Sequence, residues 1–139
     1  MEIIAVALQT VQANQSVYFT DTTVCGGPSI THRDGSGLVT LRGLTNQCRA
    51  RYKVSFGANI AVPTGETVGP ISLALAIEGE PLQSTIMIET PAAVEEFNNV
   101  FTSVFIDVPR GCCLSVSVRN VSTIPVEVQN ANLIAERVA

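Results

Sequence analysis

The chain has 139 residues and a formal net charge of −4. This charge argues against a nucleic-acid partner, because binding to phosphates requires clustered Lys and Arg. No apolar run approaches the roughly 18 residues that a membrane-spanning helix needs. Charged residues make up 14% of the sequence, against about 25% in a typical soluble domain. A surface with so few charges is typical of a chain that another subunit covers, so the composition indicates an oligomer.

The first third of the chain predicts short strands separated by polar segments. Residues 2–9 place apolar side chains on both faces, which is typical of a strand buried on both sides. A turn is expected at 12–16 and a short strand at 17–19. The glycine-rich segment 21–37 predicts a loop, and residues 38–42 predict the next strand.

The stretch from Cys48 to Pro63 predicts one unusually long strand. Every even position from 50 to 62 is apolar, and the odd positions are polar or small. Strict alternation places all the apolar side chains on one face of a strand, whereas a helix would distribute them around its axis. A strand longer than the usual range should lie at the centre of a β structure. Tyr52 and Phe56 are therefore candidate core residues.

The other face of this strand carries three of the eight positive charges in the chain, at Arg49, Arg51 and Lys53. Two interpretations are open. The three side chains could bind an acidic partner, such as a capsid surface or an anionic glycan. They could instead pair with acids on neighbouring strands or subunits, and we favour this second interpretation. The candidate acids are Asp107, Glu127 and Glu136.

The next segments predict two strands, at 71–78 and 83–89, joined by a turn at 79–81. Residues 90–99 fit either a loop or a single helical turn after a Thr-Pro cap. Residues 100–108 predict a strand with Phe101 and Phe105 on one face and Val104, Ile106 and Val108 on the other.

After a turn at 109–111, residues 112–119 alternate as a strand, and the last strand begins near Ile124. Its phase shifts near Asn130, after which Leu133 is on the apolar face; a β-bulge would explain the shift. Eight to ten closely spaced strands without a convincing helix, linker or repeat predict an all-β fold. We expect a single antiparallel β-sandwich or jelly-roll domain over residues 1–139.

The cysteines and the single histidine give little support to a catalytic or metal site. Four cysteines lack the Cys-x2-Cys spacing of zinc knuckles, so we expect free, buried thiols, although a disulfide from Cys25 or Cys48 to Cys112 or Cys113 stays open. A base and its orienting acid could be read in His32 and Asp34, with Ser29 or Ser36 as the nucleophile. A solvated loop histidine is the favoured interpretation, and we expect neither an enzyme nor a cofactor.

The order of these features resembles the tumour necrosis factor/complement-type jelly roll, and in particular its bacterial branch at the tips of collagen-like spore-surface and phage proteins. The resemblance covers essentially the whole chain. It rests on four segments: Arg51–Phe56 as an aromatic-rich strand, Ala76–Pro81 as a strand ending in a Glu-Gly turn, the turn Val108–Gly111, and Asn130–Ala139 as the final strand. The chain departs from the pattern because no Gly-x-y run precedes the domain.

The resemblance implies a homotrimer about a threefold axis. Candidates for the domain core or that axis are Tyr52, Phe56, Phe101, Phe105 and Leu133. Three functions remain open: a bacteriophage virion accessory protein (capsid decoration or fibre head), a spore-surface domain, and a lectin-like module for host glycans. We favour the first, with the protein made in the bacterial cytoplasm, because residues 1–9 lack the basic start of an export signal. Its expected partners are further copies of itself and a capsid or other particle surface, without nucleic acid or membrane.

Overall fold

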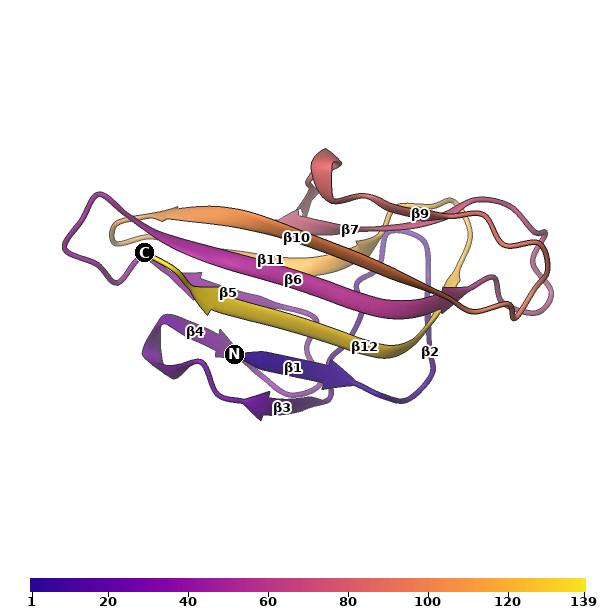
Figure 1. Cartoon of the computed structure of the whole chain (residues 1–139), viewed down its shortest axis with the longest axis horizontal. Coiled ribbons are helices and arrows are strands. Elements are labelled where there is room, and N and C mark those ends of the chain that lie inside the picture. The colour runs from indigo at the N-terminus through magenta and orange to yellow at the C-terminus, as the bar shows by residue number, and fades with distance from the viewer.

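The computed structural model describes residues 1–139 as a sandwich of two antiparallel β-sheets (Figure 1). Two three-residue 3-10 turns accompany the strands, and the structure contains no helix of the length and apolarity needed to cross a membrane. The elements are β1 (Glu2–Ala5), β2 (Gln9–Val11), β3 (Asp21–Val24), η1 (Gly27–Ser29), β4 (Ile30–His32), β5 (Val39–Arg42), β6 (Arg49–Ala61), β7 (Ile71–Ile77), β8 (Glu80–Pro81), η2 (Gln83–Thr85), β9 (Met87–Glu89), β10 (Asn98–Pro109), β11 (Cys113–Asn120) and β12 (Val126–Arg137).

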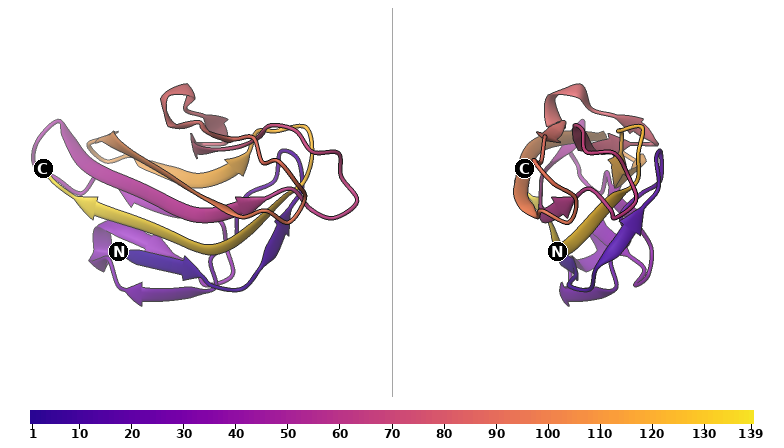
Figure 2. Two further views of the ribbon diagram at one scale, coloured as in Figure 1. Left: turned by 45° about the vertical axis from the view of Figure 1, so that its right-hand side comes forward. Right: turned by 90° about the vertical axis from the view of Figure 1, so that its right-hand side faces the viewer.

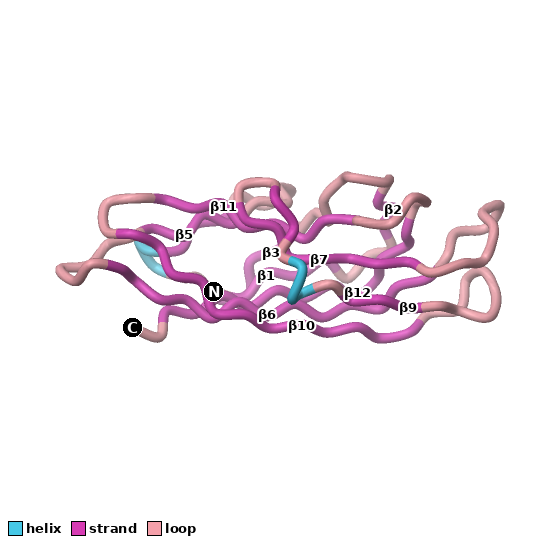
Figure 3. The backbone as a smooth tube through the Cα atoms, turned by 90° about the horizontal axis from the view of Figure 1, so that it is seen from above, coloured by secondary structure: helices cyan, strands magenta, loops and turns pink.

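The two layers of the sandwich are sheet A and sheet B. Sheet A has the strand order β10-β6-β12-β1-β3, with β2 also paired to β12. Sheet B has the order β4-β5-β11-β7-β8, with β9 also paired to β7. The C-terminal strand, yellow in Figure 2, lies between β6 and the N-terminal β1, so both ends of the chain belong to sheet A. Loops gather at both ends of the sandwich (Figure 3).

The long strand β6 lies inside sheet A, between β10 and β12, as its alternation predicts. Its pairing with β10 is unbroken from Asn98 opposite Ile60 to Pro109 opposite Arg49. The even residues of β6 are buried, whereas the odd residues up to Asn59 are half-buried. One face of β6 therefore forms part of the core and the other forms part of the surface.

A single apolar cluster fills the space between the two sheets. Tyr52, Phe56 and Leu133 have no exposed surface. Phe56 meets Phe19 edge to face, with ring centroids 6.2 Å apart, which is a favoured geometry for aromatic pairs. The buried Tyr52 hydroxyl donates hydrogen bonds to the carbonyl oxygens of Ser29 and Arg42, so its burial leaves no polar atom without a partner.

Two predicted backbone features are confirmed. The pairing of β12 with β6 shifts register between Gln129 and Asn132, and Asn130 adopts a left-handed conformation with φ 55°; this is the predicted bulge. The predicted Glu-Gly turn lies at Glu78 and Gly79, with positive φ at both (53° and 85°), whereas Glu80–Pro81, expected within the turn, form β8. Such a turn matches the twist of a two-stranded hairpin.

Several sequence-based expectations for the first half of the chain are wrong. The N-terminal strand ends at Ala5 and is buried on one face only, that of Ile3 and Ala5. Val6 and Leu8, expected within the strand, lie beyond it and are 58% and 51% exposed. Residues 17–19 form no strand, although Val17 and Phe19 are buried. The predicted loop 21–37 contains β3 and β4. Their apolar content is low because Asp21, Thr22 and Thr23 form most of β3.

Two later expectations are also corrected or resolved. The predicted strand 83–89 begins with the turn η2, and only Met87–Glu89 is a strand. Thr85 explains the turn: its hydroxyl is buried and bonds both to Leu82 O, at 2.7 Å, and to the backbone of Leu75. Of the two alternatives for 90–99, the structure has a loop that leads into β10. With its short additional pairings the sandwich has twelve strands rather than eight to ten.

Candidate interaction surface

The surface of sheet A that faces away from the core is the candidate functional site, and we call it the outer face of sheet A. Alternation in β6, β10, β12 and β1 determines which side chains project from it. Four large apolar side chains in strands of sheet A are exposed, whereas sheet B contributes only Ile88. These four are Val24, Phe101, Phe105 and Ile134.

Phe101 and Phe105 are the most prominent groups on this face, at 66% and 63% exposed. They lie in β10, directly opposite Gly57 and Lys53 of β6. A Cβ atom on Gly57 would lie 3.6 Å from Cδ2 of Phe101. The ring of Phe101 therefore rests against the strand where β6 has no side chain, which is how aromatic residues cover glycines in sheets.

Uncharged polar side chains between these apolar groups are paired with neighbouring side chains. Ser55 and Ser103 hydroxyls lie 3.0 Å apart, and Asn99 Nδ2 donates to Asn59 Oδ1 at 3.2 Å. On the other side of β12, Asn132 Nδ2 donates to Glu2 Oε2 at 2.7 Å. This hydrogen bond and a second from Thr23 hold the pKa of Glu2 below its ordinary value. Satisfied polar groups make the face suitable for burial against a partner.

A charged cluster lies at the end of the outer face where β6 begins. Arg51 donates two hydrogen bonds to Asp107, from Nε to Oδ1 at 2.8 Å and from Nη2 to Oδ2 at 3.2 Å. Arg49 approaches the same carboxylate at 3.4 Å. The hydrogen bond from Arg51 is the main reason that the pKa of Asp107 is lowered, and the same bond raises the pKa of Arg51. Bidentate pairs of this kind fix side-chain geometry.

The three predicted basic residues are thus differently placed. Arg49 and Arg51 share the Asp107 carboxylate within the chain. Lys53 lies opposite Glu136 of β12 on one side and Phe105 of β10 on the other. Glu127, the other acid considered for this role, is opposite Ala61 at the far end of β6.

The five aromatic and aliphatic candidates divide into two groups. Tyr52, Phe56 and Leu133 lie in the core between the sheets, while Phe101 and Phe105 lie outside it. Val24 and Ile134 of the outer face were not among the predicted residues. Ile134 could have been found from the phase shift at Asn130, because the bulge turns the even positions after it outward; Val24 could not, since it follows three polar residues.

A shallow pocket of about 280 Å³ lies at the edge of this face. It is lined by Met1, Glu2, Val24, Ile134 and Glu136. Met1 is fixed there because its amino group donates to Ala135 O at 2.7 Å. The pocket extends the apolar character of the face toward β3.

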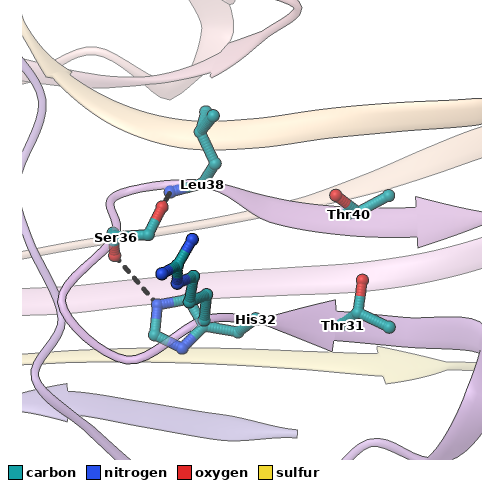
Figure 4. A pocket seen from close by; sticks show the side chains of 6 residues that line it. Thr31, His32, Ser36, Leu38 and Thr40 are labelled. Carbon is teal, nitrogen blue, oxygen red and sulfur yellow. Dashed lines mark hydrogen bonds between the residues drawn. The ribbon is translucent and has the colours of Figure 1, made fainter.

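His32 is a structural residue, not a solvated loop histidine. Its side chain has no exposed surface, and its ring meets that of Phe19 edge to face. Nε2 lies 2.9 Å from the backbone carbonyl oxygen of Ser36, as Figure 4 shows. Nδ1 faces Thr22 Oγ1 at 3.4 Å and Asp34 Oδ1 at 3.7 Å.

These contacts remove the catalytic interpretation of His32. Both ring nitrogens are engaged, and the Ser36 hydroxyl accepts a hydrogen bond from Leu38 N at 3.0 Å instead of meeting the imidazole (Figure 4). A nucleophile must lie within hydrogen-bond reach of its base. The pocket of about 310 Å³ beside His32 is lined mainly by polar side chains from β4, β5 and the loop between them.

The four cysteines also differ from expectation. Cys25, Cys48, Cys112 and Cys113 are free, and all four are exposed rather than buried. The structure brings together no group of three or more His, Cys, Asp or Glu side chains that could hold a metal ion.

Comparison with known proteins identifies the fold. No model of a known protein family matches the sequence, and no curated protein does. Solved structures do match. The globular domain of zebrafish complement 1qA protein has a TM-score of 0.70 at 13% identity, covering 99% of this chain and 95% of that one. Eiger TNF from S. frugiperda has a TM-score of 0.68 at 16% identity, covering 100% and 92%. Murine APRIL at pH 5.0 has a TM-score of 0.65 at 10% identity, covering 97% and 95%.

The likeness extends over the full length of the chain at sequence identities that show the fold alone. Two antiparallel sheets, a near absence of helix and these neighbours agree with the sequence-based fold class. The chain is a jelly roll of the tumour necrosis factor/complement type.

Proposed function

We propose that this chain is a non-enzymatic structural and adhesion protein that forms a homotrimer through the outer face of sheet A. The observation that carries the proposal is the exposure of Phe101 and Phe105 on a strand face where the neighbouring serine and asparagine side chains are paired with one another. Aromatic residues are enriched in the centres of protein interfaces, where they supply much of the binding free energy.

Self-association explains this face better than a small ligand does. The pocket on it is shallow, and the apolar side chains are distributed over β3, β12 and β10 rather than gathered around one cavity. The edge strand β10 is twelve residues long and pairs only with β6. Exposed long edges are prone to uncontrolled pairing unless a subunit covers them. The low charge content of the chain and its resemblance to a trimeric family also favour self-association.

We propose a bacteriophage virion as the location of the protein, either as a capsid decoration or as the head of a fibre. The supporting feature is the resemblance of the whole chain to the bacterial branch of the family, which includes the tips of collagen-like phage proteins; residues 130–139 by themselves resemble the final strand of the spore proteins. Adhesion by such a module would use several weak contacts, which threefold symmetry multiplies. A spore surface and a host glycan are the other locations and partners to which the same module would be suited.

The trimer is tested by replacing the two exposed aromatic residues together. Phe101→Ser with Phe105→Ser removes apolar area that contributes nothing to the core of the single chain, so the variant should fold and elute as a monomer. Ile88→Ser is the matched control, since Ile88 is 67% exposed but belongs to sheet B; it should elute as the parent does. A double variant that keeps the parent's mass would exclude this face as the interface.

The location is tested separately, by quantitative mass spectrometry of purified phage particles and of spores from the source organism. Stoichiometric amounts of the chain in virions are expected. Its presence only in spores would replace the virion with the spore surface. A chain absent from both that is retained on a glycan array would support the lectin-like function.

A further inference from the structure

Glu127 is the only acidic residue that is buried in the structure. It lies in β12 between Val126 and Val128, both of which face the core, so its side chain projects from the opposite side of sheet A. Its neighbours across the ladder are Ala61 in β6 and Thr10 in β2. Glu127 is 8% exposed, and its Oε2 atom is buried without a hydrogen-bond partner.

A second carboxyl group, that of Glu95 in the loop 90–97, approaches from the end of β6: Glu127 pairs with Ala61, and the carbonyl oxygen of the next residue, Val62, accepts the Glu95 N–H. The Glu95 side chain faces Glu127 there. Glu95 is firmly held. Its backbone has φ 58°, and its N–H donates to Val62 O at 2.9 Å. Its Oε1 atom accepts hydrogen bonds from Thr64 N at 3.1 Å and from Thr64 Oγ1 at 2.9 Å. The pair therefore joins the loop 90–97 to β12 and to the loop that follows β6.

No positive charge is present to balance the two carboxyl groups. The surrounding protein desolvates Glu127, and the Glu95 carboxyl lies beside it; only a protonated Glu127 can donate a hydrogen bond to that group. The residues facing it from β2 and β6, Thr10 and Ala61, are uncharged. Two ionised carboxylates offer each other only acceptors and repel, whereas one protonated carboxyl can donate to the other.

We propose that Glu95 and Glu127 form a one-proton clamp that holds the loop 90–97 against sheet A in mildly acidic solution and releases it as the pH rises toward and above neutrality. The proton lies on Glu127 and is donated to the Glu95 carboxylate. When Glu127 ionises, this proton passes to solvent and two facing carboxylates remain. Both carboxyl groups belong to one chain, so the clamp can be measured whether or not the chain is a trimer.

The direction and range of the effect follow from linkage. Burial, with Glu95 beside it, raises the pKa of Glu127 from 4.5 to about 7. Once the loop opens, Glu127 returns to its ordinary pKa, so the stabilisation is complete below pH 4.5 and is lost as the pH rises to 7. Glu95 has the opposite sign: hydrogen bonds lower its pKa, and its contribution is lost only as the pH falls below its ordinary value of 4.5. The equilibrium constant for opening of the loop 90–97 should increase roughly 10- to 100-fold from pH 5 to pH 8.

Amide hydrogen exchange at Glu95 and Thr64 measures this opening directly, because their N–H groups bond to Val62 O and to the Glu95 carboxylate. After correction for the intrinsic pH dependence of exchange, protection of both amides should fall roughly 10- to 100-fold from pH 5 to pH 8. Glu127→Gln keeps a permanent donor in place and should hold the amides equally protected at both values. Glu96→Gln, which removes the neighbouring exposed charge, should behave as the parent does.

Two results would overturn the clamp. The first is corrected protection that does not change between pH 5 and pH 8 in the parent chain, a measurement that requires no variant. The second is a loss of protection in Glu127→Gln between pH 5 and pH 8 that equals the loss in the parent. In that case ionisation of Glu127 would not be the cause of the opening.

Discussion

The ring of Phe101 rests over Gly57 on the neighbouring strand, where a Cβ atom would lie 3.6 Å from the ring. This contact joins the centre of β6 to the most exposed aromatic side chain of the outer face of sheet A. A side chain at residue 57 would have enough room for one methyl group, because the nearest backbone atom to its Cβ, Val100 O, would be 3.7 Å away.

We expect Gly57→Ala to be tolerated and to raise the free energy of unfolding by about 0.5–1 kcal/mol, because alanine loses less backbone entropy in a strand. Gly43→Ala is the contrasting variant, since its Cβ would lie 2.1 Å from Pro109 O. It should cost more than about 2 kcal/mol, because the backbone must move. Urea unfolding of both variants measures the difference, and similar midpoints for the two would contradict the packing described here.

The pKa of Asp107 should lie below its ordinary value, with Arg51 as the main cause. Arg51→Ala should raise this pKa toward its ordinary value, and Arg49→Ala should raise it less, because Arg49 acts only through its charge. Both shifts should shrink in high salt, since the side chains are 39% to 43% exposed. Carboxyl-detected NMR titration gives the values; an Arg49→Ala effect larger than that of Arg51→Ala would contradict the geometry.

Replacement of His32 should destabilise the fold. His32→Ala leaves the Ser36 carbonyl without its donor and creates a cavity beside Phe19, so we expect a loss of about 2–4 kcal/mol. Ser36→Ala removes only the hydroxyl that accepts from Leu38 N and should cost about 1 kcal/mol or less. Chemical unfolding distinguishes the two. Equal effects would mean that the imidazole is not the structural centre of this loop.

Much of the fold could be predicted because some segments carry a strong local pattern. The alternation of β6 permits only one face to be buried, and the phase shift at Asn130 permits only a bulge. The segment 21–37 carries no such pattern: β3 is polar because it is a half-exposed edge strand. The burial of His32 depends on Phe19 and Ser36, whose approach is set by tertiary structure.

The candidate surface was only partly predictable for a related reason. Phe101 and Phe105 share one face of β10 while Ile106 and Val108 share the other, and both faces are apolar. Periodicity assigns residues to faces but cannot say which face meets the core. Pairing with β6 decides this, because Val108 must lie beside the buried Ala50 and Phe105 beside Lys53.

The mass of the purified chain in solution tests the central claim most directly. A single chain has a mass of 14.7 kDa. Sedimentation equilibrium at micromolar concentration should give three times this value, about 44 kDa, because the outer face of sheet A is then covered by neighbouring copies. A mass of 14.7 kDa under the same conditions would show that this face is free, and would contradict the proposal that the chain functions as a trimer.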